Sequence, residues 1–222
     1  HKKEVLFDDV FPWARNTNIR QKILKKGFLN HGEEYLQNAY KNTLKGISYL
    51  ESDDKLNRRM REMFILNLNW FMQTLLDRSD RCSMYNGLEI RVPFCDYRLA
   101  QYLWNIPWEM KTYKGREKGL LRHIMKDILP SEIIDRKKSP YPKTHNPTYL
   151  NAVKNMLTNI MNNSSSPIHN ILNRSYILEI LESDGSAFTK PWFGQLMTGP
   201  QLMAYLCQVN MWLEKYQPTI EL

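Results

Sequence analysis

A glutamate and an arginine stand two residues apart in an otherwise apolar stretch near the middle of the chain. The stretch Leu88-Glu89-Ile90-Arg91-Val92-Pro93-Phe94 ends its alternation of apolar and charged residues at a proline, which favours an extended backbone. Side chains alternate along an extended chain, so Glu89 and Arg91 should project to one side and their apolar neighbours to the other. Such a pair is either a structural salt bridge, which is the commoner case, or the polar floor of a site.

A second feature is a strongly basic region between Lys111 and Asn146, which holds ten basic residues against four acidic ones. It includes Arg136-Lys137-Lys138, followed by a segment stiffened by three prolines. A positive field attracts anions, and a rigidly mounted cation suits a phosphate held in a defined geometry. The alternative is a solvated basic surface with no ligand, again the commoner case for an isolated basic turn.

Several familiar kinds of site are absent from the sequence. It contains no phosphate-binding loop of the GxxxxGK[ST] or GxGxxG type, and no nucleophile motif adjoins His123 or His145. The three cysteines have no CxxC spacing and the five histidines are scattered. We therefore expect no metal held by side chains of this segment and, from the cysteine usage, a reducing cytoplasm.

Helical periodicity dominates the elements that must position these residues. The clearest helix should follow Ser52 as its N-cap and run past Leu75. The other predicted helices cover 33–50, a short stretch after the N-cap Asp96, 116–129, 147–161 and 200–216. The polar segment Asn162–Pro167 is the best candidate for a linker.

Composition is that of an ordinary globular protein. The chain has 222 residues, 42% of them apolar and 24% charged, with a net charge of +8. Its apolar runs are far shorter than a bilayer-spanning segment, and no secretory signal is visible. These features predict an all-α fold in a single domain over 1–222, with a C-terminal subdomain over 166–222 as an alternative division.

Several stretches together resemble the glutamine-hydrolysing asparagine synthetases. Leu76–Met84, Gly87–Asp96, Lys114–Arg122, Arg136–Tyr141 and Lys190–Leu196 match that family's motifs in the same order. The matches run from the Phe11-Pro12-Trp13 region to about Tyr216. Each is weak alone, but the set is highly specific.

The sequence also departs from that family, which has a glutaminase domain followed by a synthetase domain. The Ser-Gly-Gly-x-Asp-Ser loop that wraps pyrophosphate and the Gly-Asp-Gly-x-Asp-Glu segment are not found here. The resemblance therefore implies the helical C-terminal portion of an adenine-nucleotide α-hydrolase-like synthetase domain, with most of its parallel sheet missing.

The resemblance implies a reaction in which ATP and Mg²⁺ adenylate aspartate and ammonia from glutamine then displaces AMP. By motif position, Lys138 would stabilise the pyrophosphate, with Lys118 and Arg122 on one helical face beside it. Glu89 would handle a proton or orient the intermediate, and Arg91 would orient Glu89 or meet the substrate carboxylate. Asp80 and Arg81 would support this group, although an ordinary ion pair explains them equally well.

The same resemblance implies that most contacts to ATP and Mg²⁺ come from outside this segment, which would be inactive alone. It leaves room for a homodimer of the full-length enzyme and predicts no nucleic-acid or membrane partner. Two alternatives remain open. One is a related amidotransferase or β-lactam synthetase on the same scaffold, and the less favoured one is an all-α nucleic-acid-binding module that uses residues 111–146.

Overall fold

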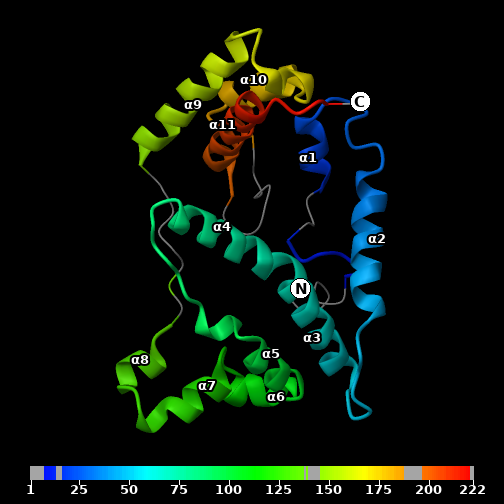
Figure 1. The fold of residues 1–222 in the computed structure, drawn as a ribbon, viewed down its shortest axis with the longest axis vertical. Coiled ribbons are helices and arrows are strands. Elements are labelled where there is room, and N and C mark those ends of the chain that lie inside the picture. Colours follow the sequence, from blue (N-terminus) through cyan, green and yellow to red (C-terminus); the bar gives the residue numbers. More distant parts are fainter. Residues whose placement is uncertain (1–7, 14–16, 138, 140–145, 188–196, 221–222) are drawn as a thin grey trace. The chain divides into compact units, whose positions relative to one another are not determined.

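The computed structural model describes residues 8–13, 17–137, 139, 146–187 and 197–220, and it is helical with no strand in those ranges (Figure 1). The pairing nearest to sheet structure is an isolated antiparallel bridge between Leu24 and Leu172. The all-α prediction is therefore confirmed. Among the described helices, none combines the length and the apolar content that crossing a bilayer requires.

The chain divides into two compact units, and one of the three points at which it passes between them lies inside the helix α2 (Gly32–Lys45). The first unit comprises residues 1–9 and 38–140, and the second comprises 10–37 and 141–222. The second unit is thus wider than the 166–222 subdomain, and the division of the chain into domains stays a prediction. The Asn162–Pro167 segment, predicted as a linker, lies within the second unit, where Ser166 is buried.

In the first unit, consecutive helical segments form one long rod, which precedes Glu89 in the sequence (Figure 1). It consists of α3 (Lys55–Leu66), a π-helical stretch (Asn67–Met72) and α4 (Gln73–Met84). The N-cap is Asp54, whose side chain accepts a hydrogen bond from the Asn57 backbone N–H, so the predicted cap at Ser52 is wrong. Asp53, one residue earlier, is instead paired with Arg61.

The remainder of the first unit is built from short helices. They are α5 (Tyr97–Trp104), α6 (Trp108–Lys111), α7 (Gly119–Ile124) and α8 (Ser131–Asp135). The predicted cap at Asp96 is confirmed, because its carboxylate accepts from the Arg98 backbone N–H. The single helix predicted over 116–129 is wrong. The chain there forms α7 followed by a 3₁₀ turn at Met125–Asp127.

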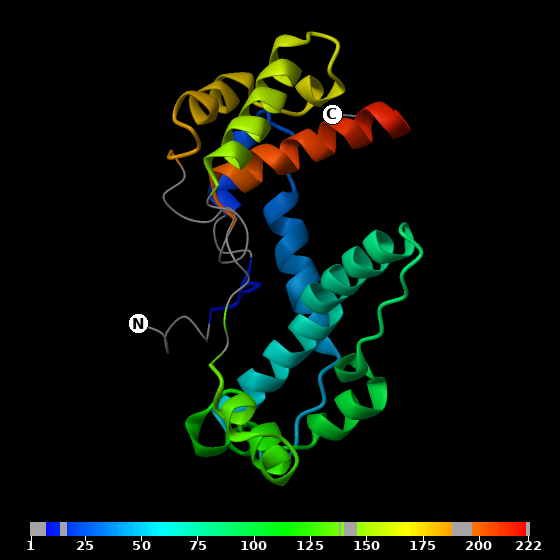
Figure 2. The ribbon, with the colours of Figure 1, turned by 90° about the vertical axis from the view of Figure 1, so that its left-hand side faces the viewer.

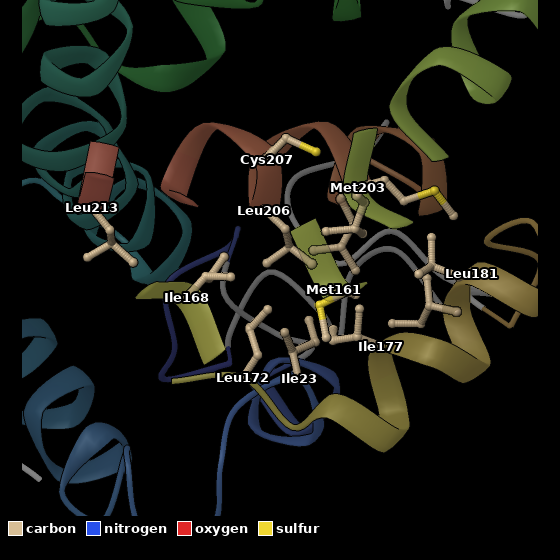
Figure 3. Close-up of a cluster of buried hydrophobic side chains, with 13 residues drawn as sticks. Ile23, Met161, Ile168, Leu172, Ile177, Leu181, Met203, Leu206, Cys207 and Leu213 are labelled. Atoms are coloured by element: carbon tan, nitrogen blue, oxygen red, sulfur yellow. The ribbon is translucent and has the colours of Figure 1, made fainter. Parts of the chain in front are cut away.

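In the second unit, helices far apart in sequence enclose a cluster of buried apolar side chains. They are α1 (Thr17–Ile23), α9 (Pro147–Asn162), α10 (Arg174–Glu182) and α11 (Gly199–Tyr216), with a 3₁₀ turn at Pro167–Asn170. Helices α9 and α11 pack against each other, as the view in Figure 2 also shows. Figure 3 shows the apolar side chains between them, including Met161, Met203 and Leu206.

Two glycines allow the turn that follows α10 to approach the first residue of α11 closely. Gly185 has a φ of +77°, which a side chain disfavours, and its Cα faces Gly199. A Cβ on Gly199 would lie 2.4 Å from the Gly185 Cα. Only glycine fits both positions without moving the backbone.

Candidate active site

Glu89 and Arg91 lie on the extended segment that follows α4, in the first unit. The turn into this segment uses Gly87 at a φ of +69°, and the Leu88 backbone N–H donates to the Ser83 carbonyl at 2.9 Å. Arg91 Nε donates to Glu89 Oε1 at 3.0 Å, so the two side chains share a side as the alternation predicts. Both are well exposed, and an exposed pair contributes little to stability. The pair therefore remains accessible to a ligand.

Asp80 and Arg81 lie near the end of α4, a few residues before that segment. Arg81 Nε and Asp77 Oδ1 are 2.7 Å apart, one helical turn apart on an exposed face. The Asp80 side chain is exposed, while its backbone carbonyl accepts from the Ser83 hydroxyl. Arg81 is thus ion-paired with Asp77, which accounts for Arg81 but not for Asp80. A role for either residue in substrate binding stays a prediction.

Lys118 precedes α7 and adopts a left-handed backbone, with a φ of +56°. The chain turns there because the buried Gly119 lies against the backbone of Tyr113, where a Cβ would meet the Tyr113 oxygen at 2.3 Å. This close approach leaves no room for a side chain at the first residue of α7. The sequence predicted that Lys118 and Arg122 share one helical face. In the structure, Lys118 instead lies before the first residue of α7, where it is exposed.

Arg122 directs its guanidinium at backbone carbonyls. Nε donates to the Glu117 carbonyl at 3.0 Å, Nη2 donates to the Arg136 carbonyl at 3.0 Å, and Nη1 donates to the Ile134 carbonyl. The neighbouring Arg116 forms an ion pair of 2.7 Å with Asp135. The described structure thus uses Arg122 to join two backbone segments. Its predicted contact with phosphate stays a prediction.

The basic run after α8 is described only in part. Arg136 and Lys137 are exposed, whereas Lys138 lies outside the described residues. The motif residues Lys190–Leu196 also lie outside them. The described part of the predicted site therefore has two portions of the first unit, one around Glu89 and one around Lys118 and Arg122.

Comparison with known proteins places these residues in a family. The family model described as asparagine synthase matches residues 1–214. This chain belongs to the asparagine synthase family. It is 46% identical over 213 residues to glutamine-hydrolysing asparagine synthetase 3 of Bacillus subtilis, covering 95% of this chain and 35% of that protein. It is also 28% identical over 167 residues to asparagine synthetase 1 of the same organism, covering 75% and 26%.

The human glutamine-hydrolysing asparagine synthetase is 32% identical over 117 residues, which cover 51% of this chain and 19% of the human protein. The chain thus spans about a third of the length of the first of these curated relatives and less of the others. The family resemblance found in the sequence motifs is confirmed.

In this member of the asparagine synthase family, three surface cavities outlined by described residues all lie in the second unit. They are lined around Lys25 and Arg174, around Phe28 and Tyr35, and around Ser165 and Glu214. None of the described site residues predicted from the sequence lines them. A cleft shared by Glu89, Lys118 and Lys138 stays a prediction.

Sequence reasoning missed two buried arginines of α3 that hold the first unit together. Arg61 donates to both oxygens of Asp53, at 2.6 and 3.0 Å, and to the Trp104 carbonyl. Its guanidinium also lies 5.1 Å from the centre of the Trp104 ring. Arg59 donates to the Tyr40 hydroxyl at 2.8 Å and to Glu62 at 2.6 Å. In the sequence they look like surface charges, so periodicity could not reveal them.

Lys111, at the start of the basic region, extends this network. Its ammonium lies 5.5 Å from the centre of the Phe64 ring. Burial, together with the nearby Arg61 charge, lowers the pKa of Lys111, because both disfavour the charged form. Not every cation of the basic region therefore faces solvent.

Proposed function

We propose that this chain is the helical part of the synthetase domain of an ATP-dependent, glutamine-hydrolysing asparagine synthetase. The observation that carries the proposal is the family match over 1–214, together with 46% identity to a glutamine-hydrolysing synthetase across 95% of the chain. In the proposed reaction, an aspartate side-chain oxygen attacks the α-phosphorus of ATP and pyrophosphate leaves. Ammonia from glutamine then attacks the acyl carbon, the bond to AMP breaks, and the nitrogen gives up a proton.

Cations of the basic region would serve the first step, in which negative charge grows on the departing pyrophosphate. A positioned lysine stabilises that charge without solvent reorganisation. We assign this role to Lys138, from its motif position, and a phosphate-binding role to Lys118. The exposure of Lys118 beside the start of α7 supports its assignment.

Glu89 and Arg91 would serve the second step. A carboxylate beside the acyl-adenylate accepts the proton that the attacking ammonia loses, or orients the intermediate. The ion pair of 3.0 Å supports a role for Arg91 in orienting Glu89. Asp80 and Arg81, near the end of the preceding helix, would support the same group of residues.

ATP and Mg²⁺ would be bound mainly by residues beyond this chain. Among the described residues, no group of three or more histidine, cysteine, aspartate or glutamate side chains is arranged to hold a metal ion. The cations discussed above supply donors for phosphate oxygens but no ligands for Mg²⁺. We further propose a cytoplasmic enzyme, which its three free cysteines support, with neither nucleic acid nor membrane as a partner. A homodimer of the full-length enzyme is also part of the proposal.

The test uses the complete synthetase that carries these residues. Lys138→Ala should lower pyrophosphate release about 10²- to 10³-fold, the range typical of losing one transition-state donor. Glu89→Gln should lower asparagine formation about 10²-fold or more with the fold intact. The matched controls Lys126→Ala and Glu132→Gln alter exposed residues of the same basic region and should keep normal turnover.

Wild-type turnover in Lys138→Ala or Glu89→Gln would remove that residue from the site. The 222-residue chain alone should form no asparagine, and detectable formation would contradict its assignment as a partial domain. A panel of acyl substrates distinguishes asparagine formation from a related amidotransferase or β-lactam synthetase reaction. Binding of nucleic acid that weakens steeply with salt would instead favour the nucleic-acid module.

A further inference from the structure

Two arginines of the family motif 114–122 hold the backbone that leads into the basic run. Arg122 donates to the carbonyls of Ile134 and Arg136, and Arg116 pairs with Asp135 at 2.7 Å. Three consecutive residues, 134–136, are thus each contacted by an arginine from the other segment. These contacts join residues that lie 12 to 19 positions apart in the chain.

The surroundings of Arg122 favour a structural contact over a contact with phosphate. Its side chain is only 16% exposed, and each of its three nitrogens donates to a backbone carbonyl. The Glu117 carboxylate lies 3.9 Å from Nη2 and adds a nearby negative charge. Three of the five guanidinium N–H donors are thus used in bonds to the backbone, and the low exposure of the side chain leaves little surface for a phosphate oxygen. Arg136 and Lys137 are exposed by comparison.

The segment that supplies the two arginines has a constrained backbone conformation. Lys114 and Lys118 both have left-handed backbone conformations, at φ of +57° and +56°, which non-glycine residues seldom adopt. Gly119 is packed against the Tyr113 backbone with no room for a side chain. The backbone conformation of this segment fixes where the Arg122 side chain begins. The bonds from Arg122 and Arg116 then fix the position of residues 134–136 relative to this segment.

We propose that Arg122, assisted by Arg116, is a positioning residue that sets the backbone of 134–136 relative to Lys118. It acts on ATP only through this backbone, by placing the exposed cations Arg136 and Lys137. The nucleotide part of the proposal rests on the proposed synthetase function, whereas the contact itself does not. Arg122 therefore supports anion binding without touching the anion.

The first measurement is amide hydrogen exchange in the complete protein, which is independent of activity. Arg122→Lys keeps the charge but replaces the planar guanidinium by one compact ammonium, which cannot reach three separate carbonyls in the directions that the guanidinium nitrogens serve. Exchange in peptides covering 131–137 should speed up about tenfold or more, which corresponds to the loss of a charged hydrogen bond. Exchange in α9 and α11 should be unchanged, which shows that the second unit stays folded.

The matched control is Arg98→Lys, which alters an exposed arginine of the same unit that pairs with Asp96 at 2.6 Å. It should leave exchange at 131–137 as in the wild type. Asp135→Asn removes only the Arg116 ion pair and should give a smaller acceleration, and it provides the test if Arg122→Lys fails to fold. Unchanged exchange in the variant of Arg122, or equal acceleration in Arg98→Lys, would overturn the proposal.

The second measurement separates positioning from direct contact. In the complete synthetase, Arg122→Lys and Asp135→Asn should both raise the KM for ATP, because both loosen the same backbone. Asp135 carries a negative charge, so its neutralisation would strengthen ATP binding if simple electrostatics were at work. A raised KM in Arg122→Lys with wild-type exchange at 131–137 would instead identify Arg122 as a direct phosphate ligand. If the enzyme forms no asparagine at all, the proposed function fails while the exchange result still decides the contact.

Discussion

The contacts inside the first unit differ in kind from the contacts inside the second unit. Among its described residues, the second unit buries thirteen apolar residues in one cluster, and Leu157, Ile177 and Met203 in it are fully enclosed. Within its described residues the first unit has only Tyr40 and Leu66 as buried apolar residues. It relies instead on Arg59 and Arg61 of α3, each 5% exposed.

This difference affects how accurately each unit positions its residues. The hydrophobic effect is non-directional, whereas an arginine bonded to carboxylates and carbonyls joins particular atoms of the backbone in a defined geometry. Arg61 ties Asp53 to the end of α5, and Arg122 ties 116–122 to 134–136 in the same manner. The unit that contains Glu89, Arg91 and Lys118 is therefore the one held by directional bonds.

The largest predicted effect is the loss of a buried arginine in the first unit. Arg61→Met leaves Asp53, whose side chain is 4% exposed, without its charged partner. Unfolding of the first unit should become easier by about 3–5 kcal/mol, the usual consequence of stranding one member of a buried pair. Amide exchange in α3 and α5 measures it. Adding Asp53→Asn should restore part of the loss, and a single variant as stable as wild type would show that the pair is dispensable.

The corresponding change in the second unit is Leu157→Ala on α9. Removing this fully buried side chain should lower the stability of the second unit by about 2–5 kcal/mol through lost burial and the remaining cavity. Urea unfolding with exchange read out in α9 and α11 measures the change. Met156→Ala removes a half-exposed neighbour on the same helix and should stay within about 0.5 kcal/mol. Similar losses of stability in both variants would contradict the claim that burial of Leu157 in the apolar cluster stabilises the second unit.

Acid should change the stability of the first unit through one carboxylate, and this effect is smaller than those of the two substitutions above. The hydrogen bonds from Arg61 hold the pKa of Asp53 below its ordinary value of 3.8. A depressed folded-state pKa gives stability that is fully present above the unfolded value and disappears as pH falls through the folded one. The contribution of the Asp53–Arg61 pair to the stability of the first unit should therefore be constant from pH 7 to about 5 and decline as pH falls below 3.8. Exchange at fixed pH steps follows it, and an Asp53→Asn variant with the same acid profile would exclude Asp53 as the cause.

The smallest predicted effect is chemical rather than energetic, and it concerns the cysteines. Burial raises the pKa of the Cys207 thiol in α11 to about 11, whereas Cys82 in α4 is exposed. The thiolate is the reactive form, so a disulfide reagent at neutral pH should label Cys82 and leave Cys207 unmodified. Mass spectrometry of the labelled peptides decides it. Leu157→Ala should increase labelling of Cys207, and equal labelling of both thiols in the wild type would show that the apolar cluster is open.

Local sequence signals determined much of the helical content. Pro147 at the first turn predicts the start of α9, and the apolar spacing from Leu202 to Leu213 predicts α11. Asp96 before α5 and the alternation around Glu89 and Arg91 were equally readable, because caps and periodicity depend on neighbours within a few residues. The family was also readable, since its motifs are contiguous stretches of sequence.

Only the tertiary structure decided which charges are buried and which segments meet. Arg61 and Arg122 look in the sequence like Arg98, yet the first two are enclosed and bonded to distant residues while Arg98 stays exposed. The close approach of Gly119 to the Tyr113 backbone likewise exists only in the folded chain. A pattern along the chain records only local preference, whereas burial and a guanidinium's partners depend on residues brought together from far apart by folding.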